Sequence, residues 1–289
     1  RAHNNLGIAL GAEGKNEEAI SHYKRAIELE PNYAKPHNNL GNALGAEEKN
    51  EEAISHFKKA IKLNPDYTDA YNNLGIALRR EGKIEEAISH FKIAIKLNPD
   101  YADAYNNLGI ALGAEEKNEE AISHFKKAIK LNPEHARAHN NLGIALGAEG
   151  KNEEEISHYK MAIKLDPDFA VAHNNLGSAL DAEGKNEEAI SHYKMAIKLN
   201  PEYADAHYNL GSALDAEGKN EEAISHYKMA IKLNPDDFWA HNKLGHALVQ
   251  KGEMKEAVYH YRETVRLRPD LDAARDNLEF ALLRLRELE

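Results

Sequence analysis

The stretch "NEEAISHFKKAIKLNPDY", residues 50–67, decides the fold, because close copies of it recur along the whole chain. Its apolar residues lie three and four positions apart, which is the pattern of a helix with one buried face. They are Ala53, Ile54, Phe57, Ala60, Ile61 and Leu63. Glutamates at the start and lysines near the end suit the helix dipole, and Pro65 stops the helix.

A second phrase, "YNNLGIAL" at residues 71–78, shows the period of the repetition. Its Leu-Gly pair recurs every 34 residues, and eight of the nine prolines keep the same spacing. Such a period predicts an array of helical pairs. The expected units are 1–33, 34–67, 68–101, 102–135, 136–169, 170–203, 204–237 and 238–271, followed by a terminal helix over 272–289.

Small and polar residues predict the ends of these helices. Glycine in the phrase "EGK" suits a left-handed turn between the two helices of a pair, and Glu48 and Glu116 replace it in two units, where strain is expected. An asparagine before each second helix is expected to cap it. These asparagines are Asn16, Asn50, Asn118, Asn152, Asn186 and Asn220.

The Leu-Gly glycine lies inside a helix, where glycine costs about 1 kcal/mol relative to alanine. All eight units carry it, from Gly7 to Gly245. We therefore expect the partner helix to approach closely at this point, with small alanines of the second helix as the facing surface.

A period of 34 with Leu-Gly, alanine, an aromatic residue, alanine and proline resembles the tetratricopeptide repeat family over the whole chain. The aromatic residues are Tyr23, Phe57, Phe91, Phe125, Tyr159, Tyr193, Tyr227 and Tyr261. The resemblance implies an all-α protein, a right-handed α-solenoid of eight helix-turn-helix units with a capping helix. It also implies that the first helices line the concave face and the second helices the convex face.

The terminal segment 272–289 is expected to cap the array with one apolar face. The inward residues are Leu278, Ala281, Leu282 and Leu285. Phe280, Leu283 and Leu288 extend this surface, so two interpretations stay open: a cap with a wide face, or a contact that joins two copies as a homo-oligomer or docks a further domain.

Composition excludes several classes of function. The net charge of −11 disfavours nucleic acid and an anionic membrane surface as partners. The chain has no cysteine, which removes thiol chemistry and fits a reducing, cytoplasmic location. It begins inside a repeat at Arg1, so we expect a piece of a longer protein.

Two adjacent asparagines precede the Leu-Gly pair in six of the eight units, with Tyr208 and Lys243 as the exceptions in the last two, and they form two rows on the groove side of the first helices. The outer row is Asn5, Asn39, Asn73, Asn107, Asn141, Asn175 and Asn209, and the inner row includes Asn38, Asn72, Asn106 and Asn140. The outer row resembles the asparagine ladder in the tetratricopeptide superhelix of O-linked N-acetylglucosamine transferases, which implies that it clasps a peptide backbone. The alternative is that these amides bond between neighbouring repeats.

Charged groove positions predict a polarity. Arg79 and Arg80 lie in the N-terminal half, and Asp181 and Asp215 occupy the helix position of Arg79 in the C-terminal half. A peptide ligand would be oriented by these charges. Small residues elsewhere, such as Gly45-Ala46 and Gly113-Ala114, leave space for a guest. The alternative is that these are scattered, solvated charges.

Histidines and serines offer no catalytic or metal-binding pattern. Eight histidines recur in the second helices, but equivalent helices lie about 8–10 Å apart, too far for neighbouring members to share an ion. They are His22, His56, His90, His124, His158, His192, His226 and His260. We predict no cofactor, no metal and no enzyme activity in the chain itself.

Three functions fit these observations. The first is a non-catalytic scaffold that binds an extended peptide or a partner protein in its concave groove. The second is the substrate-recruiting arm of a larger enzyme, such as a glycosyltransferase. The third is a self-assembling structural protein that uses the terminal helix.

Overall fold

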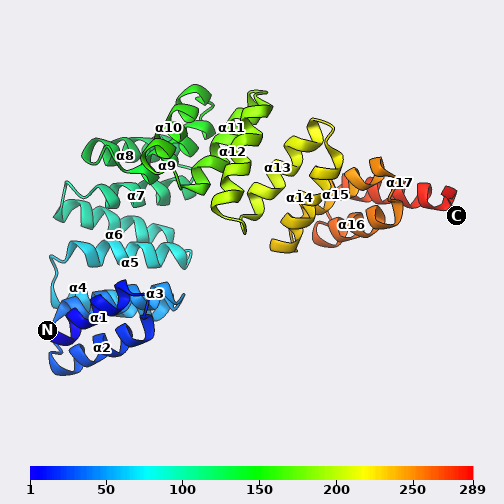
Figure 1. The fold of residues 1–289 in the computed structure, drawn as a ribbon. Coiled ribbons are helices and arrows are strands. Elements are labelled where there is room, and N and C mark those ends of the chain that lie inside the picture. Colours follow the sequence, from blue (N-terminus) through cyan, green and yellow to red (C-terminus); the bar gives the residue numbers. More distant parts are fainter. Residues whose placement is uncertain (289) are drawn as a thin grey trace. The chain divides into compact units, whose positions relative to one another are not determined.

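The computed structural model describes residues 1–288, which form seventeen helices and no strand (Figure 1). The chain divides into two compact units, unit 1 (Arg1–Lys151) and unit 2 (Asn152–Glu289). The helices of unit 1 are α1 (Ala2–Ala12), α2 (Asn16–Leu29), α3 (Ala34–Ala46), α4 (Asn50–Leu63), α5 (Thr68–Arg80), α6 (Ile84–Leu97), α7 (Ala102–Ala114), α8 (Asn118–Leu131) and α9 (Ala136–Ala148). Those of unit 2 are α10 (Asn152–Leu165), α11 (Ala170–Ala182), α12 (Asn186–Leu199), α13 (Ala204–Ala216), α14 (Asn220–Leu233), α15 (Phe238–Lys251), α16 (Met254–Leu267) and α17 (Asp272–Leu288).

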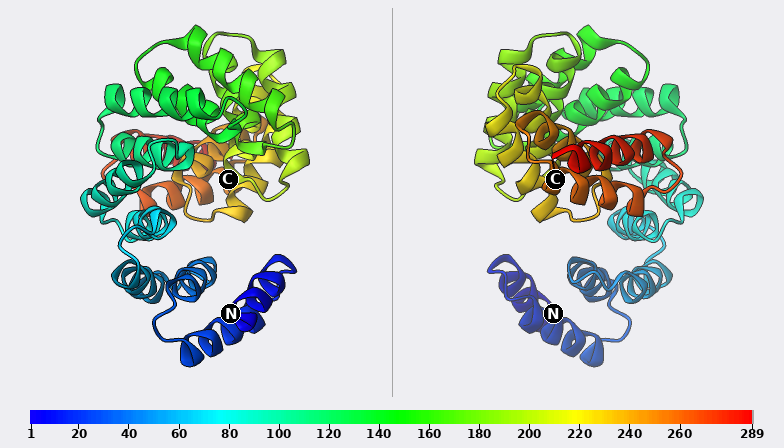
Figure 2. Two further views of the ribbon diagram at one scale, coloured as in Figure 1. Left: turned by 90° about the vertical axis from the view of Figure 1, so that its left-hand side faces the viewer. Right: turned by 90° about the vertical axis from the view of Figure 1, so that its right-hand side faces the viewer.

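Neighbouring helices pack in sequence order within each unit. In unit 1, α3 packs on α4 and α5 on α6, and each second helix also contacts the first helix of the next pair (Figures 1 and 2). Unit 2 repeats the arrangement from α10 to α17. The predicted all-α solenoid of helix-turn-helix pairs is therefore confirmed.

The odd-numbered helices also contact one another across successive pairs. In unit 1 these contacts join α1 to α3, α3 to α5, α5 to α7 and α7 to α9, and in unit 2 they join α11 to α13 and α13 to α15. Because the odd-numbered helices crowd together in this way, they line the inner face of each unit. Side chains on that face are the candidates for ligand contact.

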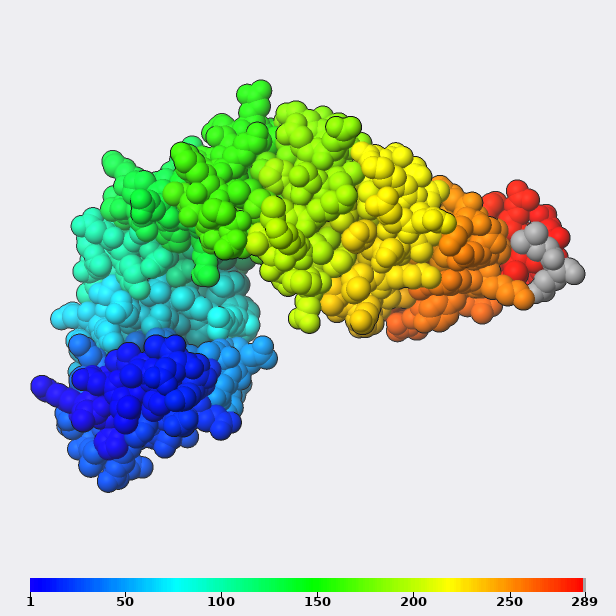
Figure 3. Space-filling model, in the orientation of Figure 1, coloured from blue at the N-terminus to red at the C-terminus, as the bar shows by residue number. Residues whose placement is uncertain are grey.

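The core of each unit combines leucines from odd-numbered helices with alanines and aromatic rings from even-numbered helices. Figure 3 shows the successive pairs of unit 1, coloured blue to green, as closely packed layers. The core of unit 1 includes Leu74, Leu78, Phe91, Leu108, Leu112 and Phe125. That of unit 2 includes Leu176, Leu180, Tyr193, Leu210, Leu214 and Tyr227.

The Leu-Gly glycine allows the closest contact between the two helices of a pair. A Cβ atom on Gly109 would lie 2.6 Å from the ring of Phe125, and one on Gly177 would lie 2.6 Å from the ring of Tyr193. Close approach was the expectation, and it is confirmed. The facing group was predicted to be alanine and is instead the aromatic ring of the second helix, which lies flat over the glycine and needs the room of the missing Cβ.

The turn inside each pair has the expected left-handed residue. Gly14, Gly82 and Gly184 have φ angles of 76°, 73° and 75°, while Glu48 and Glu116 adopt 61° and 59° at the same place. The turn closes in the same way with either residue, since the N–H groups of the following lysines donate to the leucine carbonyls five residues earlier. The two glutamates therefore carry the predicted backbone strain without changing the turn.

The prediction that asparagine caps the second helices is wrong. The helices begin at the asparagine itself, the preceding lysine stands at the N-cap, and its side chain makes no capping hydrogen bond. Asn50 shows the consequence, because its Oδ1 atom is buried and has no hydrogen-bond partner among residues 1–288. The asparagine side chain lies one residue too late to reach the free N–H groups of the first turn.

Helix α17 packs on α16 through the predicted apolar face. Ala281 is fully buried, and Leu278, Leu282 and Leu285 are partly buried against the core of unit 2. Phe280 and Leu283 are 48% and 52% exposed. The predicted last residue of this cap, Glu289, lies outside the described residues. None of the helices described is both long and apolar enough to cross a lipid bilayer.

Candidate functional site

The asparagine rows form a ladder of hydrogen bonds between successive odd-numbered helices. Outer amides donate from Nδ2 to the inner asparagine Oδ1 of the preceding pair. In unit 1 the bonds are Asn39 to Asn4 (3.0 Å), Asn73 to Asn38 (3.1 Å), Asn107 to Asn72 (3.0 Å) and Asn141 to Asn106 (3.0 Å). In unit 2 they are Asn209 to Asn174 (3.0 Å) and Asn277 to Asn242 (3.1 Å).

The two rows differ in exposure. The inner asparagines Asn38, Asn72, Asn106 and Asn140 are buried, with Asn72 only 4% exposed, so they offer a ligand little surface. The outer asparagines are partly exposed on the inner face of their unit. Asn39, Asn107 and Asn209 each use one N–H group in the ladder, so that a second N–H group and the acceptor oxygen remain. Asn73 and Asn141 also accept from the preceding inner asparagine at 3.5 Å and 3.4 Å, so that each keeps one N–H group and part of its acceptor capacity.

The ends of the rows follow the same geometry. Asn5 is exposed, and Asn175 is partly exposed like the other outer amides. Two positions depart from asparagine. Tyr208 takes the inner position of the seventh pair, and Lys243 takes the outer position of the eighth pair. The ladder resumes at α17, where Asn277 supplies the outer amide.

Two arginines at the end of α5 form the positive part of the face in unit 1. Arg80 is exposed and donates from Nη1 to the carbonyl of Gly45 at 3.0 Å, at the end of α3. Arg79 is half-buried, and both burial and the neighbouring Arg80 lower the pKa of its guanidinium. Neither arginine forms an ion pair within residues 1–288.

Two cavities open on the inner face of unit 1. The first, of about 220 Å³, lies between α3 and α5 and is lined by Asn42, Asn73, Ile76 and Arg80. The second, of about 330 Å³, lies among α7, α8 and α9 and is lined by apolar residues, with Asn118 and Asn141 at its edge. Its apolar residues include Ile110, Phe125, Ile144 and Ala148.

A third cavity of about 580 Å³ lies along the turns between the pairs of unit 1. Tyr33 and Tyr67 line it together with Lys35 and Asp69. Burial raises the pKa of the Tyr67 hydroxyl, and Asp69 raises it further. This cavity is polar and mixed in charge, so it selects no single ligand chemistry.

Acidic residues take the corresponding positions in unit 2. Asp181 and Asp215 are both partly exposed, and burial raises the pKa of the Asp181 carboxyl. The Oδ1 atom of Asp215 is buried and has no hydrogen-bond partner in the part of the chain described. Ser178 lies one turn before Asp181 and accepts from Tyr193 Oη at 3.4 Å. The inner face of unit 2 is thus rich in acceptors.

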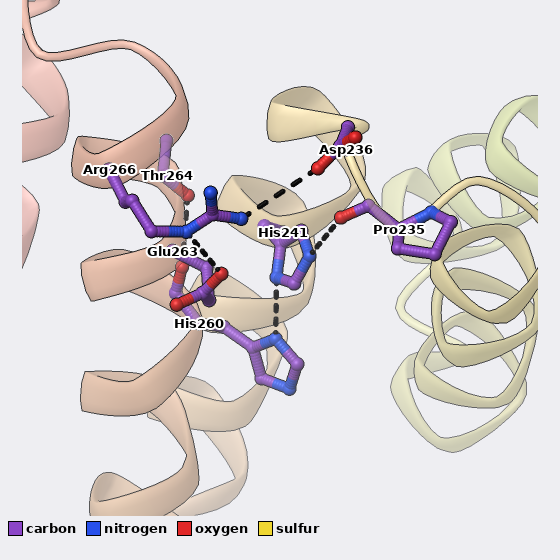
Figure 4. Close-up of polar contacts among 7 residues, drawn as sticks. All are labelled: Pro235, Asp236, His241, His260, Glu263, Thr264 and Arg266. Carbon is purple, nitrogen blue, oxygen red and sulfur yellow. Dashed lines mark hydrogen bonds and ion pairs between the residues drawn. The ribbon is translucent and has the colours of Figure 1, made fainter.

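The histidines of the second helices meet side chains of the first helix in the same pair. His241 Nε2 donates to the carbonyl of Pro235 at 3.1 Å, which leaves its Nδ1 to accept from His260 Nδ1 at 2.9 Å (Figure 4). The other described pairs are His3–His22, His37–His56, His173–His192 and His207–His226, at 2.8–3.1 Å. In two pairs Tyr71 and Tyr105 replace the first histidine and lie over His90 and His124.

Burial disfavours the charged form of several of these histidines. Burial, followed by the charges of His56 and Lys59, lowers the pKa of His37 to about 4. Burial and the neighbouring His241 lower that of His260 to about 4 as well. Across residues 1–288 no group of three or more histidine, cysteine or acidic side chains could hold a metal ion.

The structure thus brings together some of the predicted site residues. It places the outer asparagines and Arg80 on the inner face of unit 1, and Asp181 and Asp215 on that of unit 2. Sequence reasoning missed Asn42, Ile76 and Ile110 as cavity residues. A comparison of the repeats in register would have found them, because within unit 1 Asn42 alone interrupts the row of isoleucines.

These features define a helical-repeat protein with an amide-lined inner face. The sequence matches the tetratricopeptide repeat over residues 9–47, 41–82, 77–115, 148–182, 180–216 and 211–252, and again over 102–135, 124–156 and 240–271. The chain therefore belongs to the tetratricopeptide repeat family. Membership supports a general role in protein interaction. Comparison with curated proteins finds no match.

Solved structures share the fold. A chain from the crystal structure of the APC/C hetero-tetramer Cut9-Hcn1 is 19% identical, with a TM-score of 0.77 over 92% of this chain and 52% of that one. PilF of Pseudomonas aeruginosa is 19% identical, with a TM-score of 0.64 over 72% and 94% of the two chains. YrrB, a TPR protein with an unusual peptide-binding site, is 26% identical, with a TM-score of 0.48 over 64% and 95%. This chain spans about half the length of the Cut9-Hcn1 chain that it matches.

Proposed function

We propose that the protein is a non-catalytic scaffold whose inner face binds an extended peptide segment of a partner protein. The outer asparagines would hold the backbone of the peptide, with the remaining N–H group and the carbonyl of each amide. In unit 1 these are Asn5, Asn39, Asn73, Asn107 and Asn141, and in unit 2 they are Asn175 and Asn209. The charged residues Arg79, Arg80, Asp181 and Asp215 would contact its side chains.

One observation carries the proposal: the ladder holds the outer amides of Asn39, Asn73, Asn107, Asn141 and Asn209 in one orientation. The hydrogen bond from Asn107 to the buried Asn72 holds the side chain in place before a ligand arrives, at a cost in side-chain entropy that folding has already met. A peptide backbone presents alternating N–H and C=O groups, which an amide complements from both its ends. Regularly spaced amides can therefore hold a chain without selecting its side chains.

The inner asparagines serve this arrangement from inside the fold. Asn38 and Asn72 accept the ladder bonds and are buried, so we assign them to the orientation of the outer row. The same assignment covers Asn106 and Asn140, which are equally buried. The same outer amides would then serve two purposes. One N–H group bonds to the neighbouring repeat, and the remaining polar groups would contact the ligand.

Two matched quadruple variants test the proposal. Changing Asn39, Asn73, Asn107 and Asn141 to alanine removes four ladder bonds together with the four exposed amides. Changing Asn4, Asn38, Asn72 and Asn106 to alanine removes the same four bonds and leaves the outer amides in place. Binding to a random peptide array is measured at a temperature where circular dichroism shows both variants folded.

We expect the outer variant to lose at least tenfold in peptide affinity and the inner variant to lose much less. Both should lower the melting temperature, since each lost bond is worth about 0.5–1.5 kcal/mol. Equal losses of affinity in the two variants would show that the shared ladder bonds, and not contacts from the exposed outer amides, support binding.

A further inference from the structure

Two of the cavities on the inner face of unit 1 occupy the same position in the repeat, two repeats apart. The first is lined by Gly45, Phe57, Asn73 and Ile76, and the second by Gly113, Phe125, Asn141 and Ile144. Each has a glycine and an aromatic ring at its floor and an outer asparagine of the ladder at its rim. A peptide held by the ladder would therefore pass both cavities.

The two cavities differ at two positions only among the side chains that face a guest. Asn42 in the first corresponds to Ile110 in the second, and Arg80 corresponds to Ala148. Both substitutions act in the same direction, since they make the first cavity rich in donors and the second one apolar. Two nearly identical parts of the array therefore carry one polar, donor-rich cavity and one apolar cavity.

The first cavity has the chemistry of a carboxylate site. Arg80 spends one N–H group on the carbonyl of Gly45 and keeps four further donors. Glu48 lines an adjoining cavity with Arg80, yet no ion pair joins them within the described residues. Asn42 is exposed at the rim and adds an amide donor. An unpaired guanidinium with a planar fork of donors is the group that proteins use to bind carboxylates.

The position between the two cavities is closed to a side chain. Arg79 stands there at the place that Gly45 and Gly113 hold in the two cavities. Its side chain is half-buried, so its stem covers the floor that glycine leaves open. It forms no ion pair with any described residue, and it adds a second positive charge beside Arg80.

The second cavity has the chemistry of an aliphatic site. Ile110, Ile144 and Phe125 supply apolar walls, and Gly113 and Ala148 leave the space open. Ile144 is 50% exposed, which leaves apolar surface that a ligand side chain could cover. At about 330 Å³ the cavity accepts one branched aliphatic side chain.

We propose that unit 1 recognises an extended peptide by a carboxylate at Arg80 and an aliphatic side chain between Ile110 and Ile144. Neighbouring packed helices lie about 8–10 Å apart, so two repeats span roughly 16–20 Å. An extended chain rises about 3.3 Å per residue, which places the two ligand groups about five to six residues apart. The inference rests on the proposed function and adds the class of ligand to it.

The test uses an array of twelve-residue peptides in a neutral polar background. Each carries one glutamate and one leucine, separated by two to nine positions, in both orders. Matched peptides carry glutamine in place of the glutamate or serine in place of the leucine. Binding to the whole chain is measured by fluorescence anisotropy at low and at high salt.

We expect the tightest binding at a separation of about five to six residues, with at least a tenfold loss when glutamine or serine is substituted. Salt should weaken the glutamate peptides and leave the glutamine peptides nearly unchanged. Arg80→Ala should abolish the preference for glutamate. Ala148→Arg should make the second cavity like the first, so that a second glutamate replaces leucine as the preferred residue.

The outcomes separate the inference from the function on which it rests. If peptides bind and the outer asparagine variant abolishes binding, but glutamate and glutamine peptides bind equally, the inference is overturned and the scaffold proposal stands. An Ala148→Arg variant that folds but leaves the preference for leucine intact also overturns it. If no peptide binds, the proposed function fails, and this inference fails with it.

Discussion

Unit 1 and unit 2 are built on the same core but present different side chains on their inner faces. One row of this face reads Ile8, Asn42, Ile76, Ile110 and Ile144 in unit 1, and Ser178, Ser212 and His246 in unit 2. The next row is mostly glycine in unit 1, with Arg79 as the exception, and contains Asp181 and Asp215 in unit 2. An apolar, partly basic surface thus contrasts with a hydroxyl-rich, acidic one.

The buried contacts do not share this variation. A Cβ atom on Gly109 in unit 1 or on Gly211 in unit 2 would meet an aromatic ring at 2.6 Å or 2.8 Å. The contrast teaches which positions the fold constrains. Close-packed positions tolerate little change in volume, whereas the inner face is free to change its chemistry.

The units also differ in their histidine pairs and in the turns inside their helix pairs. The structure describes two histidine pairs in unit 1 and three in unit 2, while Tyr71 and Tyr105 interrupt the series in unit 1. Strained turns occur at Glu48 and Glu116, both in unit 1. Three experiments use these differences to test how far the two units are alike.

Acid should have the largest effect, and both units should respond to it. In unit 1 burial lowers the pKa values of His37, His56, His90, His124 and His139. The pKa values of His173, His192, His207, His226 and His260 lie below the usual value, mainly because of burial. These rings are neutral in the fold and charged in the unfolded chain, so stability is full above about pH 6.5 and falls as the pH drops toward 4. Each such group costs up to about 1.4 kcal/mol per pH unit in that window.

Hydrogen exchange, corrected for intrinsic rates, would follow both units between pH 7.5 and 5. The control is a triple variant, His173→Tyr, His207→Tyr and His241→Tyr, which gives unit 2 the pairing of Tyr71 and Tyr105. It should lower the sensitivity of unit 2 to acid. Identical acid sensitivity before and after the change would contradict the assignment of the histidine pairs.

Alanine at the Leu-Gly glycine should have the next largest effect, and it should be equal in the two units. Overpacking against Phe125 or Tyr227 costs about 1–3 kcal/mol, and about 1 kcal/mol is recovered from helix propensity. Gly109→Ala and Gly211→Ala should therefore both lower the free energy of unfolding, measured by urea denaturation.

Gly113→Ala is the matched control, because no atom lies within 4 Å of a Cβ at that position. It should raise stability by about 0.5–1 kcal/mol. If all three variants behave alike, the close contact with the ring does not decide the choice of glycine.

Relief of the strained turns should have the smallest effect and be confined to unit 1. Glu48→Gly and Glu116→Gly should each stabilise the chain by about 1 kcal/mol, since glycine adopts a positive φ without the penalty of a Cβ atom. The reverse change in unit 2, Gly184→Glu, should destabilise it by a similar amount. Thermal melts of the three variants check the sign, and a loss of stability in Glu116→Gly would refute the account of strain.

The sequence predicted the helices, their pairing and the left-handed turns because each depends on local spacing. The apolar stripe of 50–67 and the glycine of the "EGK" turn act within a few residues of themselves. The cap assigned to Asn50 was wrong because the helix begins at Asn50 itself and not one residue later. The side chain therefore does not reach the free N–H groups of the first turn. The partner of the Leu-Gly glycine was also predicted wrongly, since facing alanines were expected where the rings of Phe125 and its equivalents lie.

What the sequence determined by itself is the repeat, since a period of 34 with matched helices, turns and prolines leaves one way to bury the apolar stripes. Only the tertiary structure decided which asparagine of each pair is buried. Asn72 and Asn73 are neighbours with the same chemistry, but packing buries one and leaves the other on the inner face. Packing likewise placed Arg80 at the first cavity, whereas Ala148 takes the same position at the second, apolar cavity two repeats later. The physical reason is that exposure depends on which helices pack beside a residue, and this is a property of the assembled array.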